Sequence, residues 1–267
     1  MIGPGERHLF KLIFWVTVAV VAWGFTVIHM GAFFCFSLVT GRRFTDRLIP
    51  LVAKTWARVI LGLIRVKVVF HNTEVFDERQ ARVVVVNHQS TLDLLWAARL
   101  APSGSYGMGK KELLYVPFIN MAWWSFGFLF IDRKNTERAL RTMQGVAEKV
   151  RREKRSLFIA PEGTRTKSGE IGPFKKGAFR IALQDKLPIQ PVIVAGAWEL
   201  WPPGAWHPRK GTIHINCLPA IDTSNWNIDS LADHIEDVRA QMVAAYEQMR
   251  QQYVLPMPQP CPAIATG

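Results

Sequence analysis

The strongest constraint on this chain is a long stretch near its N terminus that carries no charged side chain. No Lys, Arg, Asp or Glu occurs between Lys11 and Arg42, and residues 12–39 are largely apolar. As one helix this stretch would be about 42 Å long, more than the roughly 30 Å of hydrocarbon in a bilayer. We therefore expect a membrane-embedded segment that is tilted, broken near Gly24 or Gly31, or partly re-entrant.

The charges on either side of this segment bear on its orientation. Arg42, Arg43 and Arg47 follow it, whereas Arg7 and Lys11 precede it. Positively charged flanks favour the cytoplasmic side, so a spanning segment would leave the rest of the chain there. We expect a membrane protein with its active domain on the cytoplasmic face, at the inner membrane if the protein is bacterial. The apolar stretch is too long for a cleaved signal peptide.

Residues 45–66 form a second, amphipathic pattern. At helical spacing, apolar residues fall on one face and basic residues on another. The apolar face holds Leu48, Val52, Trp56, Val59, Ile60, Leu63 and Ile64, and the basic face holds Lys54, Arg58 and Arg65. Such a helix can lie flat on an anionic bilayer or pack on a folded domain, and both roles can hold in different turns. Residues 1–65 are thus expected to form an N-terminal anchor with an interfacial helix.

The rest of the chain alternates between strand and helix patterns. Strands are predicted at 66–70, 81–86, 156–160, 189–194 and 212–216, and helices at 136–155 and 230–253. This alternation predicts an α/β fold with a largely parallel sheet flanked by helices, over residues 66–253. The proline-rich residues 254–267 are expected to form a disordered tail.

Composition limits the partners and the compartment. The chain has 267 residues, a formal charge of +12 and a pI near 10.0. This charge favours an anionic partner: a membrane surface, a phosphorylated substrate or a nucleic acid. Cys35, Cys217 and Cys261 are far apart and lack metal-ligand spacing, so neither a disulfide framework nor a zinc site is expected. No nucleic-acid-binding motif is present, and we expect no nucleic acid partner.

The stretch "VVVVNHQSTLD", residues 83–93, contains a candidate catalytic pair. Four consecutive valines fit a strand buried on both faces, and the following polar residues begin a loop and a helix. From the loop, His88 can fold back onto Asp93, whose carboxylate would leave the other imidazole nitrogen free as a general base. Alternatively, Ser90 and Asp93 form only a capping box and His88 is a loop residue.

Three further stretches gain meaning together. "PEGTR" follows the strand at 156–160, and its Arg165 can present a guanidinium to a phosphate, although alone it fits a surface turn. "GFLFIDR", residues 127–133, ends in adjacent opposite charges after an apolar run. "PIQPVIV", residues 188–194, taken alone is typical of an edge strand because of its prolines. Ligand sites in open α/β sheets gather at the carboxyl ends of strands, where the loops with His88 and Arg165 are expected.

In this order, the four stretches resemble the motifs of the 1-acylglycerol-3-phosphate acyltransferases, a family of lysophospholipid and glycerolipid acyltransferases. The resemblance runs from Asn87 to Val194 and, with the flanking segments, covers most of the chain to about Leu218. A histidine and an aspartate at this spacing are a weak signal alone, but the ordered set is specific. One departure is Ala160, where the family usually has an aromatic residue, which bears on the shape of the pocket wall.

The resemblance implies an enzyme of phospholipid biosynthesis. It would transfer a fatty acyl group from acyl-CoA or acyl carrier protein to the sn-2 hydroxyl of lysophosphatidic acid, giving phosphatidic acid without a metal or other cofactor. By position, His88 would be the base and Asp93 its partner. The implied acceptor-binding residues are Glu162, Gly163, Thr164, Arg165 and Arg133. Lys110 and Lys176 would bind the acceptor phosphate or the phosphates of CoA. The chain has no G-x-S-x-G nucleophile motif, and the implied mechanism needs none.

Two alternatives stay open at this stage. One is an acyltransferase of the same fold that acts on another lyso-lipid, such as lysophosphatidylcholine or a lyso-ornithine lipid. The other is a non-catalytic membrane protein that binds anionic lipid or nucleic acid through its charge. The density of basic residues favours an acceptor with an acidic phosphate.

Overall fold

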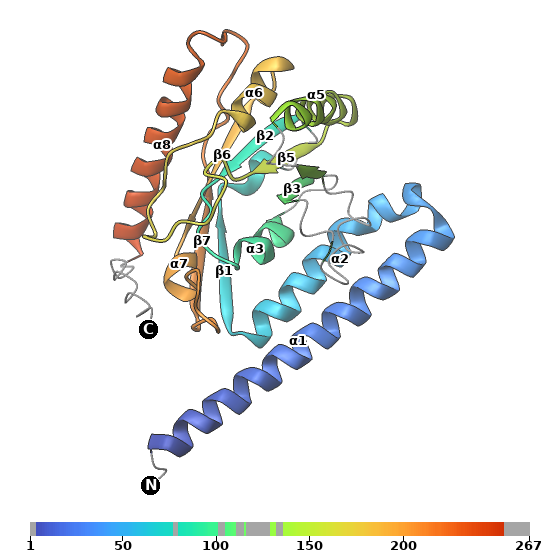
Figure 1. The fold of residues 1–267 in the computed structure, drawn as a ribbon, viewed down its shortest axis with the longest axis vertical. Coiled ribbons are helices and arrows are strands. Elements are labelled where there is room, and N and C mark those ends of the chain that lie inside the picture. Colours follow the sequence, from blue (N-terminus) through green and yellow to red (C-terminus); the bar gives the residue numbers. More distant parts are fainter. Residues whose placement is uncertain are drawn as a thin grey trace.

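The chain folds into a seven-stranded sheet covered by helices, with a helical hairpin along one side (Figure 1). The structure, a computed structural model, describes residues 4–76, 80–100, 105–110, 115, 129–131 and 136–253. Among these, the side chains of residues 4, 5, 7, 42–46, 108–110, 129–131 and 136–144 are not described. The expected disordered tail, 254–267, lies outside the described residues.

The apolar N-terminal segment is one helix, α1 (Pro4–Thr40), which neither Gly24 nor Gly31 interrupts. Over His8–Thr40 it is long and apolar enough to cross a membrane. Many of its large apolar side chains are exposed, among them Ile28 and Val39, at 73% and 87%. An exposed apolar surface of this extent fits a lipid environment.

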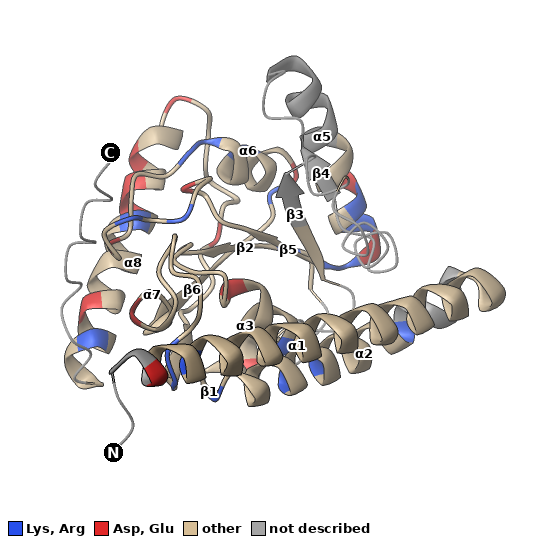
Figure 2. Ribbon diagram, turned by 60° about the horizontal axis from the view of Figure 1, so that its bottom comes forward, with Lys and Arg blue, Asp and Glu red and all other residues tan. Residues whose placement is uncertain are grey.

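The chain then turns back at Gly41 into α2 (Arg42–Leu63), which runs antiparallel to α1 (Figures 1 and 2). The indole N–H of Trp56 donates to Thr26 Oγ1 at 2.9 Å, and His29 Nε2 lies 3.0 Å from the carbonyl oxygen of Val52. Because α2 packs on the α/β layer, α1 lies along the domain instead of projecting away from it. The positive-inside argument from the flanking arginines assumed that α1 spans the bilayer and that the rest of the chain follows on the far side. Because α2 returns along α1, the cytoplasmic location of the active domain stays a proposal.

The helix predicted over residues 45–66 is present, but its buried face differs from the expected one. A ridge of small side chains at Ala53 and Ala57, followed by Leu61, is buried, and Ile60 and Ile64 are buried beside it. Alanines four residues apart let a second helix approach closely, which explains the rotation of the buried face. Two apolar positions on the other side are exposed, Leu51 at 62% and Val59 at 37%. Different turns of α2 therefore face the domain and the surroundings.

The strands form one sheet in the order β1-β7-β6-β2-β5-β3-β4. Their bounds are β1 (Val66–His71), β2 (Arg82–Val86), β3 (Tyr106–Lys110), β4 (Leu129–Ile131), β5 (Ser156–Ile159), β6 (Ile189–Ala195) and β7 (Gly211–Cys217). The five strands from β6 to β4 are parallel, whereas β7 pairs antiparallel with β6 and parallel with β1. The predicted fold class is confirmed, with two strands reversed at one edge.

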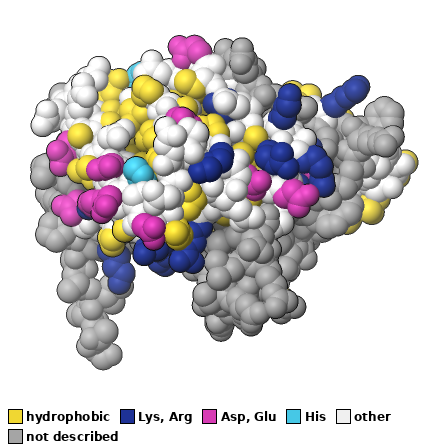
Figure 3. Space-filling model, turned by 90° about the horizontal axis from the view of Figure 1, so that it is seen from above, with side chains coloured by type: hydrophobic (Ala, Val, Ile, Leu, Met, Phe, Trp, Pro, Cys, Tyr) yellow, Lys and Arg dark blue, Asp and Glu magenta, His cyan; other side chains and the backbone are white. Residues whose placement is uncertain are grey.

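Helices cover both faces of the sheet. Their bounds are η1 (Thr73–Phe76), α3 (Asp93–Leu100), α5 (Thr136–Glu153), α6 (Gly177–Gln184), α7 (Ala197–Leu200) and α8 (Leu231–Gln252). Val83 and Val85 pack into the core beneath α5, α6 and α8, while Val84 and Val86 pack into the core beneath α2 and α3. The four valines are thus buried on both faces, as their sequence predicts. Figure 3 views the end with α6 and the start of α8, where the described acidic, basic and apolar side chains are interspersed.

The interpretation of "PIQPVIV" as an edge strand is wrong, because β6 lies between β7 and β2 and all seven of its residues are buried. Pro191 is tolerated there for a local reason. Its carbonyl oxygen accepts from the Leu218 N–H at 3.0 Å, so its nitrogen faces the same side. The β6–β7 ladder begins only at Val192, paired with Cys217. No residue of β7 therefore has to accept a hydrogen bond from a backbone N–H at position 191, which proline lacks.

Candidate active site

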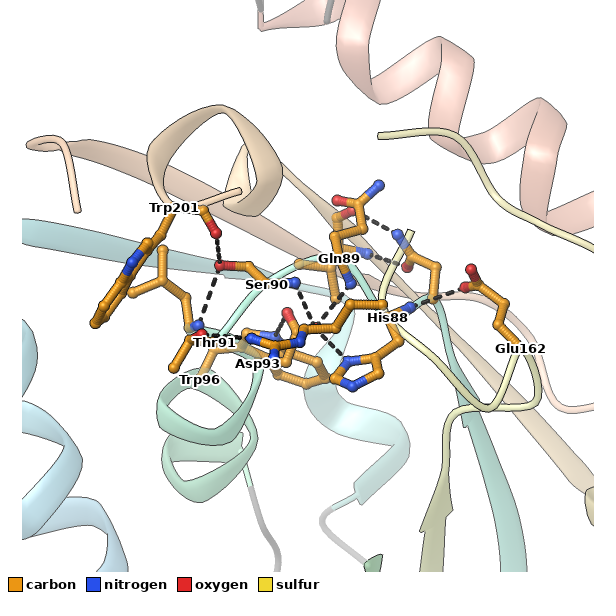
Figure 4. Close-up of polar contacts among 12 residues, drawn as sticks. His88, Gln89, Ser90, Thr91, Asp93, Trp96, Glu162 and Trp201 are labelled. Atoms are coloured by element: carbon orange, nitrogen blue, oxygen red, sulfur yellow. Dashed lines mark hydrogen bonds and ion pairs between the residues drawn. The ribbon is translucent and has the colours of Figure 1, made fainter. Parts of the chain in front are cut away.

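The candidate site lies at the end of the sheet where the parallel strands β2, β5 and β6 finish (Figure 4). The first polar residue after β2, Asn87, is fully buried and clamps two strands together. Its side-chain amide donates to the Val194 carbonyl oxygen and accepts from the Val194 N–H, both at 2.8 Å. The side chain thus replaces one rung of a ladder to β6 and sets the point at which the next loop leaves the sheet.

His88 follows in the loop, and its ring folds back onto the first residue of α3, as expected. His88 Nδ1 lies 2.7 Å from Asp93 Oδ2. The His88 side chain is 33% exposed, whereas that of Asp93 is 9% exposed. Since a carboxylate accepts, Nδ1 carries the proton, and no described residue forms a hydrogen bond with Nε2. The arrangement presents a basic nitrogen to the surface with its tautomer defined from behind.

Asp93 also caps its helix, so one residue makes both of the contacts that the sequence suggested. Its Oδ2 accepts from the backbone N–H groups of Gln89 and Ser90 at 2.9 and 3.0 Å. Ser90 Oγ in turn accepts from the Leu92 N–H at 3.2 Å, which completes a capping box. These donors fix the carboxylate where it meets the imidazole.

One partner of Asp93 was missed by sequence reasoning. The indole N–H of Trp96, a fully buried side chain, donates to Asp93 Oδ1 at 3.0 Å. In the sequence Trp96 falls among the apolar residues of the helix and gives no polar signal. Its i, i+3 spacing from Asp93 places both on one helical face and could have suggested the contact.

The loop after β5 meets the His88 loop because β2 and β5 are neighbours in the sheet. Glu162 Oε1 accepts from the His88 backbone N–H at 2.9 Å, and Oε2 accepts from the Gly172 N–H at 3.4 Å. On the other side, the Thr166 N–H donates to the His88 carbonyl oxygen at 2.9 Å. The backbone of His88 is therefore held at both ends by one neighbouring loop.

Glu162 is buried, and this burial raises the pKa of its carboxyl group from 4.5 to about 7. The backbone donors of His88 and Gly172 act in the opposite direction, since they favour the ionised form. The sequence placed Glu162 among the residues that shape and bind the acceptor headgroup. Both of its oxygens accept from backbone N–H groups beneath the His88 loop.

The turn "EGTR" needs a glycine. Gly163 has φ +76°, and a Cβ there would lie 2.7 Å from Lys175 Nζ. Beyond it, Thr164 and Arg165 are exposed, and the Arg165 guanidinium donates to Thr91 Oγ1 at 2.6 Å. This contact holds the guanidinium beside the loop that carries His88, at the surface where a phosphate can reach it.

The structure describes the other predicted binding residues in different degrees of detail. Lys176 is exposed just before α6. Lys110 is the last residue of β3, and only its backbone is described. Arg133 lies outside the described residues. Among the described residues, no group of three or more His, Cys, Asp or Glu side chains is placed to hold a metal ion.

Comparisons with known proteins agree with this geometry. The family model described as Acyltransferase matches residues 67–195. A 1-acyl-sn-glycerol-3-phosphate acyltransferase alpha of Mus musculus is 31% identical over 212 residues, which cover 79% of this chain and 73% of that protein. This chain belongs to the 1-acylglycerol-3-phosphate acyltransferase family.

Other members of this acyltransferase family extend the comparison. A 1-acyl-sn-glycerol-3-phosphate acyltransferase of Saccharomyces cerevisiae is 37% identical over 169 residues, 62% of this chain but only 56% of that protein. The chain thus spans little more than half the length of such curated relatives. The crystal structure of the 1-acyl-sn-glycerophosphate acyltransferase PlsC from Thermotoga maritima superposes on this chain with a TM-score of 0.77 at 22% sequence identity. The matched region covers 91% of this chain and 98% of the PlsC chain. The acyltransferase fold extends through nearly all of both chains.

Proposed function

We propose that this protein transfers a fatty acyl group from an acyl thioester to the sn-2 hydroxyl of 1-acylglycerol-3-phosphate, giving phosphatidic acid. The observation that carries the proposal is the oriented base: His88 Nδ1 is bonded to Asp93 at 2.7 Å, while the ring is partly exposed and Nε2 faces no described partner. The relatives from mouse and yeast are named for this activity. An alcohol is a poor nucleophile near neutral pH, so a positioned base is the group that this reaction needs.

In the proposed reaction, His88 Nε2 takes the proton of the acceptor hydroxyl as its oxygen attacks the thioester carbonyl carbon. The imidazolium that forms is stabilised by Asp93, which keeps its negative charge throughout. When the tetrahedral intermediate collapses, the carbon–sulfur bond breaks and the thiolate receives the proton from His88. The products are the ester and the free thiol, and no covalent enzyme intermediate is formed.

The acceptor phosphate is assigned to the basic side of this loop pair. Arg165 is held beside the His88 loop by Thr91, and a guanidinium binds a phosphate through two parallel hydrogen bonds. Lys176 adds a second positive charge at the surface after the same loop. Lys110 and Arg133 stay in the proposal on the strength of the sequence resemblance. Glu162 and Gly163 shape the turn, and Thr164 lies exposed within it.

The donor is an acyl-CoA or an acyl carrier protein thioester, and the proposed reaction uses no other cofactor. The acceptor comes from the membrane, against which the exposed apolar face of α1 lies. A cytoplasmic location fits the charge of +12, because the cytoplasmic leaflet has a negative surface potential. The site would then meet a soluble donor and a membrane-bound acceptor at one surface.

The test is acyl transfer from a labelled acyl-CoA, and separately from an acyl carrier protein, to a panel of lyso-lipids. The panel holds lysophosphatidic acid, lysophosphatidylcholine and a lyso-ornithine lipid, and Arg165→Ala is assayed beside the wild type. We expect lysophosphatidic acid to be preferred, and Arg165→Ala to raise its KM roughly tenfold or more while the KM for the donor stays unchanged. Preference for a neutral headgroup, or a KM that Arg165→Ala leaves unchanged, would contradict the assigned acceptor.

A further inference from the structure

A cleft outside the candidate active site lies at the same end of the sheet as His88. It is formed where the N-terminal part of α1 passes the turn from α2 into β1 and the loop that precedes β7, and this open cleft has a volume of about 280 Å³. Trp15 of α1 stacks on His207 of the loop, with ring centroids 4.8 Å apart. This stack is a direct contact between the apolar N-terminal helix and the α/β layer, so the cleft is a junction between the two.

One wall of the cleft is strongly basic. Arg65, Arg209 and Lys210 all line it, and all three are exposed. The Arg65 guanidinium lies over the Phe14 ring at 5.9 Å. Among the described residues, no acidic side chain forms an ion pair with any of these three cations. Three neighbouring positive charges with no acidic partner in the described part of the chain favour an anion from outside the chain.

The other wall is apolar and continues into the exposed surface of α1. Phe14, Leu63 and Ile64 line the cleft. On the same helix, Phe10 and Ile13 are exposed at 62% and 53%. A ligand that fits both walls needs a negative headgroup joined to hydrocarbon, which is the chemistry of a membrane phospholipid.

The position of the cleft matches the boundary of a bilayer. The apolar stretch of α1 begins at Leu12, immediately after Lys11, so Phe14 and Trp15 lie at its polar end. Tryptophan is enriched where hydrocarbon meets headgroups. In Figure 2 this end of α1 passes over the start of β1, where basic residues lie. Headgroups of lipids around α1 would therefore stand at the level of the cleft.

The cleft is separate from the acceptor site proposed above. Arg209 and Lys210 immediately precede β7, which lies two strands from β2 on one side, whereas Arg165 follows β5 on the other side. Adjacent strands are about 4.8 Å apart, so the cleft and Arg165 flank the His88 loop from opposite directions. The two sites are nevertheless connected, because Ser90 Oγ donates to the carbonyl oxygen of Trp201, where the loop to His207 begins.

We propose that this cleft binds one anionic phospholipid of the membrane, which is neither the acyl acceptor nor the product in the active site. The phosphate lies on Arg65, Arg209 and Lys210, and the first methylenes of the acyl chains lie against Phe14 and Leu63. A bound lipid joins α1 to the loop that leads back to Trp201. It thereby fixes the depth of the His88 loop relative to the bilayer surface.

The test counts bound lipids by native mass spectrometry of the full chain released from detergent, so it does not depend on activity. The probes are phosphatidylglycerol, phosphatidylcholine and inorganic phosphate. The test variants are Arg209→Gln/Lys210→Gln together and Arg65→Gln alone. The matched control is Arg152→Gln/Lys154→Gln, which removes two exposed charges at the far end of α5.

We expect the wild type to retain one phosphatidylglycerol in preference to phosphatidylcholine. The Arg209→Gln/Lys210→Gln variant should bind it roughly thirty-fold more weakly and Arg65→Gln roughly fivefold more weakly, while the control variant binds as the wild type. Equal losses in both double variants would mean diffuse attraction and would overturn the proposal, as would unchanged binding in the cleft variants. Displacement of the lipid by millimolar inorganic phosphate would show a site for a free anion and would overturn the lipid as its occupant.

Discussion

Asp93 holds His88 with the same oxygen that caps its own helix. Oδ2 accepts from His88 Nδ1 at 2.7 Å and also from the backbone N–H groups of Gln89 and Ser90. A side chain bonded in this way cannot rotate without releasing the start of α3. The orientation of the imidazole is thus tied to the folding of the helix, which makes the pair rigid before any substrate binds.

Replacing Asp93 by Asn should separate the two roles of this residue. The amide oxygen in the place of Oδ2 can still accept from the backbone N–H groups, which keeps the cap, and from His88 Nδ1, but the neutral amide no longer balances the imidazolium, and its NH2 group faces the indole N–H of Trp96. We expect kcat to fall on the order of 10³–10⁴-fold, with a loss of folding stability of about 1 kcal/mol. Steady-state kinetics and thermal unfolding measure the two effects. Near-wild-type turnover would return Asp93 to a purely capping role.

Trp96→Phe should test whether the second carboxylate oxygen needs its donor. Removal of the indole N–H leaves the buried Asp93 Oδ1 without a hydrogen-bond partner among the described residues, and we expect kcat to fall about tenfold with KM unchanged. Trp198→Phe is the matched control, since Trp198 is also buried but its indole N–H forms no hydrogen bond with any described residue. In an Asp93→Asn background, Trp96→Phe should have little further effect on kcat. Equal losses in the Trp96 and Trp198 variants, or additive losses with Asp93→Asn, would show that Trp96 acts only through packing.

Glu162 should make the stability of the protein depend on pH. Burial raises the pKa of its carboxyl group from 4.5 to about 7, so the folded state holds this proton more tightly than the unfolded state does. The contribution of Glu162 to stability is therefore full below pH 4.5 and is lost as the pH rises through 7, with a total change of about 3 kcal/mol.

Glu162→Gln removes this titration while one side-chain oxygen still accepts from the His88 N–H. Chemical denaturation at a series of pH values should show that the fall in stability between pH 4.5 and 7 is smaller in the variant than in the wild type. The assigned pKa would be contradicted if the variant lost as much folding stability as the wild type between pH 4.5 and 7, or if the wild type lost less than the variant.

Gly163→Ala should destabilise the turn beneath the active site. The position has φ +76°, and a Cβ would come within 2.7 Å of Lys175 Nζ. We expect a loss of about 1–2 kcal/mol, partly relieved because the end of the lysine can move. Gly145→Ala is the control, since Gly145 lies in α5 with open space around its Cα, and alanine there should stabilise by about 0.5–1 kcal/mol. Thermal unfolding of both variants distinguishes backbone strain from a general effect of adding a methyl group.

Much of the candidate site could be predicted from the sequence, because its main contacts join residues close together in the chain or at the ends of neighbouring strands. The spacing of His88 and Asp93 across a strand end and a helix start determines their contact, and the loop with Arg165 joins them because parallel neighbours end together. The contact of Trp96 with Asp93 was not predicted, because the Trp96 side chain has a single polar atom and is otherwise large and apolar. Whether Asp93 caps a helix or contacts His88 could not be decided from the sequence, and the structure shows that one oxygen makes both contacts.

Long-range arrangement was harder to predict. Pro191 suggested an edge strand, but the strand order places β6 in the centre, where a break in one ladder accommodates the missing N–H. The reversed direction of β1 and β7 leaves no trace in their composition. The apolar segment predicts a membrane helix, yet its return along α2 depends on contacts such as Thr26 with Trp56, which are 30 residues apart.

The most direct test of the central claim is the rate of acyl transfer to lysophosphatidic acid by the wild type and by His88→Ala, in a single turnover with saturating labelled acyl donor. Thermal unfolding confirms that the variant is folded, and Arg152→Gln serves as an unrelated surface control. The account predicts that His88→Ala lowers the rate by on the order of 10²–10⁴-fold, while the control turns over at the wild-type rate. A folded His88→Ala protein that transfers the acyl group within a factor of about three of the wild type would show that His88 is not the base.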